Sequence, residues 1–114
     1  MNRAKRACVA LSTGVAVAAI GPLPHAWSAD AAAGREKAKM CQTCHGIEGV
    51  GKMPDVPNIG GESATYLTRQ LTAFRSGERK HEQMSVIAAS LSDADIDDVA
   101  AWYSSVEFTV TLPK

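Results

Sequence analysis

The sequence contains few aromatic residues and no apolar run long enough to cross a membrane. Aromatic residues make up only 5 % of the 114 residues, although 46 % are hydrophobic. Part of this difference comes from an Ala- and Val-rich run at residues 7–20, which follows Arg3, Lys5 and Arg6. A membrane-spanning helix needs roughly 20 apolar residues, so this run is too short to act as an anchor.

The same N-terminal segment has the layout of a secretory signal peptide. Basic residues precede the apolar run, and Gly and Pro residues follow it at positions 21–24. Ala26 and Ser28 are small residues at the spacing that favours cleavage before Ala29, with cleavage before Asp30 as the alternative. We therefore expect an exported bacterial protein in the periplasm, without a membrane span after cleavage.

Removal of a signal peptide at residues 1–28 leaves one small domain at residues 29–114. A domain of about 85 residues is below the size at which an apolar core usually suffices. Exported domains of this size often contain disulfides. Here Cys8 leaves with the signal peptide, and the two remaining cysteines belong to one short motif. Another component must therefore complete the core.

The mature domain also lacks an excess of positive charge. Its nine basic and twelve acidic residues give a net charge of −3. Nucleic-acid-binding domains carry clustered positive charge, so we expect no nucleic-acid partner. A basic cluster at residues 75–80 and an acidic cluster at residues 93–98 are either solvated helix ends or a docking surface. No nucleophile, base or carboxylate pair has catalytic spacing, so we expect no enzymatic activity.

The remaining cysteines lie in the pentapeptide Cys41-Gln42-Thr43-Cys44-His45. A C-x-x-C-H sequence is typical of a covalent attachment site for c-type haem. Two thiols three residues apart lie on one face of a helical turn, where each can form a thioether with a haem vinyl group. The neighbouring imidazole can then bind the iron, and a buried haem supplies the missing core. A zinc site built from these side chains lacks a suitably spaced fourth ligand.

Three helical segments are expected in the mature domain. The first runs from Ala31 to about Cys44 and leads into the motif. Residues 46–61 contain five glycines and two prolines, and we expect this loop to wrap around the cofactor. The second helix begins after Ser63 and ends at Gly77, and the third begins after Ser92 with a capping box.

Apolar residues at helical spacing predict which faces of the helices are buried. Leu67, Leu71 and Phe74 form the expected core stripe of the second helix. The third helix has an apolar face containing Ile96, Val99 and Tyr103. The alternating residues 106–112 predict an extended tail that lies on the helical body.

A haem held by one histidine has an open sixth position, for which the mature chain offers several candidates. Met40 lies beside the motif and cannot reach the opposite face of a haem. Met53 is only eight residues beyond His45, so the chain between them would need to follow a tight path for Met53 to bind the iron. Met84 follows the second helix and can approach from the far side, so we favour it. His81 is either an exposed histidine in a polar turn or a competitor of Met84.

Several short motifs follow one another along the mature domain. In chain order they are CQTCHG, PNIGG, YLTRQL, GER, QMS and LSDADIDDVAAWYSS. This series resembles the motifs of the class I cytochromes c, and within that class those of the small bacterial periplasmic group related to cytochromes c4 and c553. The similarity runs from about Ala33 to Ser105. It implies an all-α class I cytochrome c fold, in which the N-terminal and C-terminal helices cross and enclose one covalently bound haem c.

The resemblance also implies roles for individual residues of the cofactor site. Cys41 and Cys44 match the thioether sites, His45 the proximal iron ligand and Met84 the distal ligand. Pro57 matches the proline whose carbonyl oxygen accepts a hydrogen bond from the proximal imidazole.

The resemblance further implies where the two terminal helices meet. Gly34 matches the small residue at the crossing, and Trp102 and Tyr103 supply its aromatic side. Ala38 stands where relatives often carry an aromatic residue, so the packing there is either looser or filled by Trp102.

The expected function is the transfer of single electrons in a periplasmic respiratory chain. The donor is a dehydrogenase, for example of the sulfite or alcohol type, or a membrane complex, and the acceptor is an oxidase or another cytochrome. We expect a monomer or a weak dimer that meets these redox proteins by diffusion. Two alternatives are a tightly bound cytochrome subunit of a multisubunit dehydrogenase, and a haem ligand sensor or peroxidase with an open sixth position.

Overall fold

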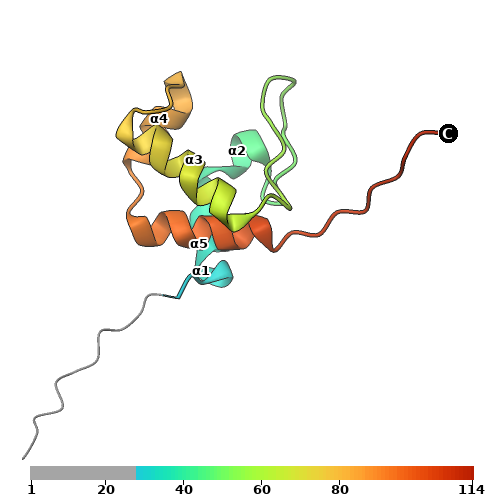
Figure 1. Cartoon of the computed structure of the whole chain (residues 1–114), viewed down its shortest axis with the longest axis horizontal. Coiled ribbons are helices and arrows are strands. Elements are labelled where there is room, and N and C mark those ends of the chain that lie inside the picture. The colour runs from blue at the N-terminus through green and yellow to red at the C-terminus, as the bar shows by residue number, and fades with distance from the viewer. Residues whose placement is uncertain (1–27) are drawn as a thin grey trace, which may run out of the picture.

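The computed structural model of the chain describes residues 28–114. The expected signal peptide therefore lies outside the described residues, apart from Ser28, as does Cys8. The regular structure of the described part is entirely helical (Figure 1), which confirms the all-α class. Its elements are α1 (Ala31–Lys37), the 3-10 turn η1 (Ala38–Met40), α2 (Gln42–His45), α3 (Ala64–Ser76), α4 (Glu82–Ala89) and α5 (Asp93–Ser104).

Helices α1 and α5 cross at Gly34, as the resemblance implied. A Cβ atom at this position would overlap the main-chain carbonyl of Asp98 and press on Trp102. The side chain of Asp98 accepts a 2.7 Å hydrogen bond from the main-chain N–H of Asp30, which begins α1. Lys37 and Asp95 form an ion pair of 2.8 Å between the same two helices. The missing side chain of glycine therefore sets how closely the terminal helices approach.

The first helical segment is not continuous, contrary to expectation. Helix α1 ends at Lys37, and the chain tightens into a 3-10 turn before α2 begins. The N–H of Cys41 donates to the carbonyl of Ala38 at 2.9 Å, and such a bond between residues three apart is the pattern of the tighter 3-10 helix. Ala38 is fully buried in the core beside α5 residues, so the position without an aromatic side chain is closely packed.

Helix α3 has the boundaries that its sequence predicted. The Ser63 hydroxyl accepts a 3.2 Å hydrogen bond from the N–H of Tyr66, and Gly77 ends the helix with a φ of 80°. Leu67 and Phe74 are buried, and Leu71 packs on the core from a partly buried position. The predicted core stripe of this helix is confirmed.

Helix α4 was not among the three segments expected from the sequence. It spans eight residues and packs mainly against α3. Only Ala88 is fully buried, and Val86 remains 71 % exposed, so the helix lacks the apolar stripe by which the longer helices were found.

Helix α5 begins with the predicted capping box. The Ser92 hydroxyl accepts from the N–H of Asp95 at 3.1 Å, and the Asp95 carboxylate accepts from the N–H of Ser92 at 3.0 Å. Ile96, Val99 and Tyr103 are all nearly inaccessible, which confirms the predicted apolar face. The core cluster combines Ala38, Leu67, Val99, Ala100 and Tyr103.

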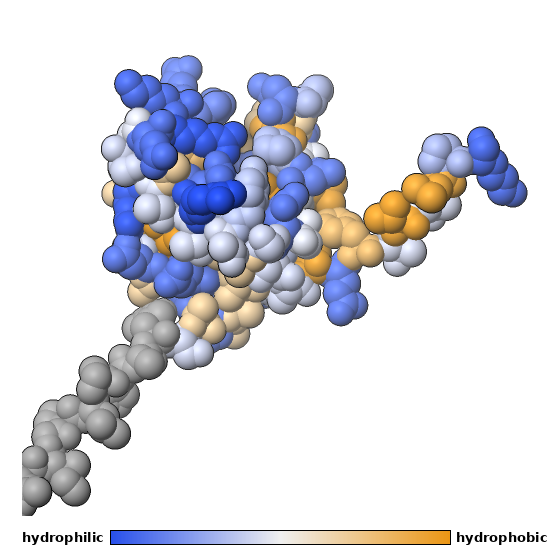
Figure 2. Space-filling model, in the orientation of Figure 1, coloured by the Kyte–Doolittle hydropathy of each residue, from blue (hydrophilic) through white to orange (hydrophobic). Residues whose placement is uncertain are grey.

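The C-terminal tail is extended, but it lies on the body only near its start. The ring of Phe108 lies against Gly60 and Gly61 in the loop between α2 and α3. Beyond it the tail projects away from the helices (Figure 1), and Figure 2 shows hydrophobic residues along this projection. Val110 and Leu112 are each 80 % exposed. The expectation that the whole tail covers the helical body is therefore wrong.

No helix between residues 28 and 114 combines the length and apolar content that crossing a membrane requires.

Candidate functional site

The pentapeptide motif forms a single helical turn. Cys41 precedes α2 as its N-terminal cap, and the N–H of His45 donates to the Cys41 carbonyl at 2.9 Å. Cys44 lies between them on the same turn. Both cysteines are free thiols and half-buried. The turn therefore gathers two thiols and one imidazole within one short element, as the spacing predicted.

The imidazole of His45 has a fixed orientation. Its side chain is 8 % exposed, and its Nδ1 lies 3.0 Å from the carbonyl oxygen of Pro57. A carbonyl can only accept, so Nδ1 is the donor, and in the neutral ring Nε2 keeps its lone pair. The contact implied by the resemblance is thus present between these two residues. An imidazole held in this way can bind a metal through Nε2.

The loop that supplies Pro57 is held by its own hydrogen bonds. The N–H groups of Ile59 and Gly60 both donate to the carbonyl of Gly49, at 2.8 and 3.1 Å. The side chain of Asn58 accepts from the N–H of Gly51 at 2.8 Å. Before Pro57, the N–H of Val56 donates to the carbonyl of Met53 at 3.1 Å. The chain is thus held on both sides of Pro57, which fixes the direction of its carbonyl.

Two aromatic residues of α5 bind the segment directly after His45. The Tyr103 hydroxyl donates to the carbonyl of Gly46 at 3.0 Å, and the Trp102 indole N–H donates to the carbonyl of Ile47 at 2.8 Å. Sequence reasoning placed both rings at the helix crossing and missed these hydrogen bonds. The signal that was available is chemical, because a buried Tyr or Trp usually finds a partner for its polar atom.

Burial changes the acidity of the groups around this contact. Burial raises the pKa of the Cys41 thiol to about 11, although the Tyr103 hydroxyl beside it acts in the opposite direction. Burial likewise raises the pKa of the Tyr103 phenol above its ordinary value. Both groups are therefore neutral at physiological pH, and their surroundings are apolar.

Met84 lies on a separate element from the pentapeptide. It occupies the third position of α4 and is half-buried, whereas Met40 and Met53 are 39 % and 45 % exposed. Figure 1 shows α2 and α4 apart from each other, on either side of α3. Among the three mature methionines considered for the sixth position, Met84 is the least exposed.

The donor atoms fit a c-type haem better than a zinc ion. Two free thiols share one turn with an imidazole whose Nε2 is available, and a thioether is present on another helix. Between residues 28 and 114, no three His, Cys, Asp or Glu side chains converge as ligands for a metal ion. The zinc alternative therefore has no ligand group within the described residues.

Comparisons with known proteins give relatives of this chain, several of them cytochromes. The family described as cytochrome C oxidase, cbb3-type, subunit III matches residues 29–102. Cytochrome c-554(548) of Halomonas halodenitrificans is 49 % identical over 81 residues, which cover 68 % of this chain and 98 % of that protein. Cytochrome c4 of Pseudomonas aeruginosa is 38 % identical over 90 residues, which cover 79 % of this chain and 44 % of that protein.

A solved structure shows the same fold. The reduced recombinant cytochrome c4 of Pseudomonas stutzeri superposes with a TM-score of 0.67 and 34 % identity, covering 73 % of this chain and 48 % of that one. The chain thus spans about half the length of the cytochromes c4 that it matches. With the family match across residues 29–102, these similarities show that the chain belongs to the class I cytochromes c, as a cytochrome c4-like electron-transfer protein with covalently bound haem c.

Proposed function

We propose that this protein is a periplasmic carrier of single electrons whose haem iron is bound by His45 and Met84. Cys41 and Cys44 form the two thioether bonds to the haem. The observation that carries this proposal is the 3.0 Å contact between Nδ1 of His45 and the carbonyl of Pro57, which leaves Nε2 free for the iron. When bound, the haem supplies a one-electron iron couple.

On the proximal side, the chain holds both the imidazole of His45 and the main chain directly after it. Pro57 accepts the Nδ1 proton, which fixes the ring and raises the basicity of Nε2. The carbonyl groups of Gly46 and Ile47, directly after His45, are bound by Tyr103 and Trp102. A ligand held in this way needs little rearrangement between the two redox states.

On the distal side, the half-buried Met84 supplies a soft thioether. A His/Met pair raises the reduction potential because the thioether favours the reduced iron, and an apolar environment disfavours additional charge. With His45 and Met84 both bound to the iron, exogenous ligands would have no open site. These properties suit an electron carrier rather than a haem ligand sensor or a peroxidase.

The redox partners follow from the same proposal. The donor is a dehydrogenase, for example of the sulfite or alcohol type, or a membrane complex, and the acceptor is an oxidase or another cytochrome. We propose that the protein acts after cleavage of a signal peptide at residues 1–28, as a monomeric or weakly dimeric domain at residues 29–114. It performs no chemistry on a substrate of its own.

Optical spectroscopy of the haem-loaded protein tests the axial ligands. The oxidised native protein should show the charge-transfer band at the red end of the spectrum that accompanies methionine ligation, and Met84→Ala should abolish it. Met53→Ala is the matched control, because this exposed methionine lies in the loop that supplies Pro57. Retention of the band in Met84→Ala, or rapid carbon monoxide binding by the reduced native protein, would overturn the proposed ligation.

A further inference from the structure

His81 forms the N-terminal cap of α4, the helix that contains Met84. Its backbone is extended, with φ −157° and ψ 135°, and its Nδ1 accepts a 3.3 Å hydrogen bond from the N–H of Met84. A side chain at this position satisfies one of the N–H groups that the first turn of a helix leaves without a partner. The bonded N–H belongs to the methionine itself, so the cap acts directly on its main chain.

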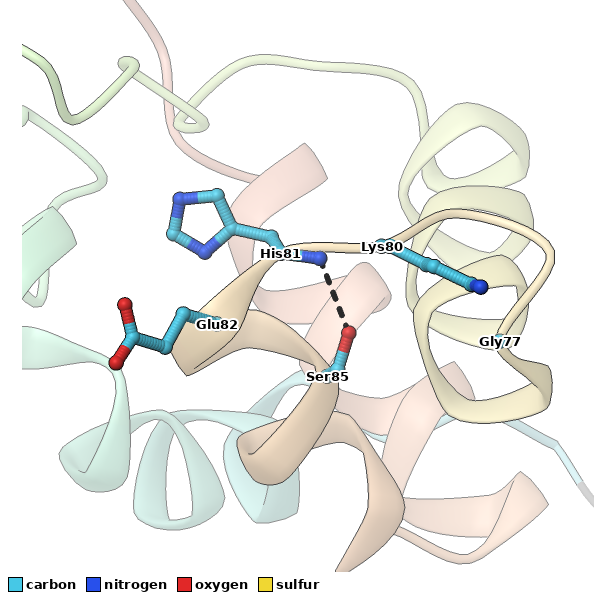
Figure 3. A pocket seen from close by; sticks show the side chains of 5 residues that line it. All are labelled: Gly77, Lys80, His81, Glu82 and Ser85. Carbon is cyan, nitrogen blue, oxygen red and sulfur yellow. Dashed lines mark hydrogen bonds between the residues drawn. The ribbon is translucent and has the colours of Figure 1, made fainter.

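Two further hydrogen bonds join His81 to Ser85. The N–H of His81 donates to the Ser85 hydroxyl at 3.1 Å, as Figure 3 shows, and the N–H of Ser85 donates to the His81 carbonyl at 2.9 Å. His81 and Ser85 therefore bracket Met84 with reciprocal bonds, in the manner of a capping box. Ser or Thr with Glu or Gln three residues later are the usual residues of such boxes. Here an imidazole takes the place of the first side chain, and the hydroxyl of Ser85, four residues later, takes the place of the second.

The same imidazole connects α4 with α3. Its ring packs edge-on against the ring of Phe74, with a centroid distance of 6.4 Å and an interplanar angle of 75°. Phe74 is buried in α3, and the Arg79 guanidinium lies 4.6 Å from the centre of its ring. Arg79 also donates to the Gln70 side chain at 2.7 Å. The imidazole that caps α4 therefore packs on a phenyl ring that is itself held in place.

Little else holds the first turn of α4. Ala88, in the last turn, is its only fully buried residue, and Glu82 and Gln83 at its start are exposed. In a helix of eight residues with so little burial, the terminal hydrogen bonds decide where the first turn lies. The position of Met84 therefore depends on its cap more than on core packing.

We propose that His81 is a positioning residue that holds Met84 at the distal side of the haem, and this inference rests on the proposed His/Met ligation. The alternative in which His81 replaces Met84 as ligand is not favoured, because Nδ1 already accepts the Met84 N–H, and a neutral ring then carries its proton on Nε2, the other possible ligand atom. Since the cap contributes a hydrogen bond and the ring contributes a contact with Phe74, the two contributions can be separated by substitution.

The test compares three substitutions at His81 in the haem-loaded protein. His81→Asn keeps a good capping side chain without the large ring, His81→Phe keeps a ring without the cap, and His81→Ala removes both. Lys80→Ala is the matched control, because Lys80 is the exposed neighbour in the same turn. The readouts are the affinity of the oxidised protein for added imidazole, the charge-transfer band and the reduction potential.

We expect His81→Ala to bind imidazole about fivefold more tightly than the native protein. Loss of the N-cap destabilises Met84 in its iron-bound position, and the free energy of a typical N-cap corresponds to about this change in affinity. His81→Asn should restore most of the native affinity, and His81→Phe should not. If the alanine variant does not fold, the asparagine and phenylalanine variants still give this comparison. Lys80→Ala should behave like the native protein.

The outcomes separate this inference from the proposed ligation. Unchanged imidazole affinity and an unchanged potential in both His81→Ala and His81→Phe, with the band lost in Met84→Ala, would overturn the positioning role alone. Absence of the band from the native oxidised protein, together with tighter imidazole binding in His81→Ala but not in Met84→Ala, would make His81 the ligand, and would overturn both proposals.

Discussion

The hydroxyl of Tyr103 donates a 3.0 Å hydrogen bond to the carbonyl of Gly46, the residue that follows His45, the proposed iron ligand. This contact joins positions 57 residues apart in the sequence, and it is buried. It makes the C-terminal helix part of the proposed haem site, because the peptide after His45 is held from α5 rather than from its own short helix.

Replacing Tyr103 by Phe should destabilise the haem-loaded protein by about 1–3 kcal/mol, because the buried Gly46 carbonyl loses its partner while the ring remains. Urea unfolding followed through haem absorbance measures this difference. Tyr66→Phe is the matched control, since the Tyr66 side chain is 40 % exposed and should tolerate the change. Equal losses of unfolding free energy in Tyr103→Phe and Tyr66→Phe would show that the hydrogen bond of the Tyr103 hydroxyl does not stabilise the protein.

Gly34→Ala should weaken the crossing of α1 and α5, because its methyl group would overlap the main-chain carbonyl of Asp98. Overpacking of this kind typically costs about 1–3 kcal/mol, and here the obstacle is backbone that cannot rotate away. Thermal unfolding measures the effect. Ala33→Ser, on the exposed face of the same helix, provides a control. A Gly34→Ala protein with native stability would contradict the close approach of these helices.

The stability of the folded protein should decrease in acid through the carboxylate of Asp95. A hydrogen bond from Lys37 and further bonds from Ser92 lower the pKa of Asp95 from 3.8 to about 2. Because the folded-state pKa is depressed, this contribution to stability is present above about pH 4 and is lost as the pH falls toward 2. In Asp95→Asn, the free energy of unfolding should fall less steeply over this pH window than in the native protein.

Acid unfolding of native and Asp95→Asn proteins between pH 5 and about 2 provides the measurement. Asp55→Asn, at an exposed loop position, serves as the control and should keep the native slope. Identical slopes in the native and Asp95→Asn proteins would mean that the interhelical pair with Lys37 does not contribute to folding.

Removing both thioether sites by Cys41→Ala and Cys44→Ala should prevent covalent haem retention. Haem staining of a denaturing gel detects the covalent bond, and the double variant should give no band. Without its haem the domain is too small for its own apolar core to be sufficient, so the level of exported protein should also fall. Haem staining that survives both substitutions would contradict thioether attachment at this motif.

Some parts of this fold could be predicted because their signals are local. Ser63 and Gly77 bound α3, and Ser92 with Asp95 opens α5, since each cap depends on residues within one turn. Helix α4 was not predicted, because its N-cap is a histidine, which is uncommon at this position, and because the helix has no apolar stripe.

The long-range contacts of the site could not be predicted from local sequence patterns. The bond between His45 and Pro57 was expected from the family resemblance, not from the residues alone. The bonds from Trp102 and Tyr103 to the segment after His45 depend on the angle at which α5 crosses the chain, which no local pattern specifies. The tail beyond Phe108 has the alternation of a strand, but within the described chain it meets no neighbouring strand.

The most direct test of the proposed His/Met centre is a potentiometric titration of the native protein and of Met84→His, followed by visible absorbance. We predict a single one-electron transition in each, with a much lower reduction potential in Met84→His, because an imidazole replaces the thioether that favours the reduced iron. A reduction potential that does not change on replacing Met84 by His would contradict methionine ligation at this position.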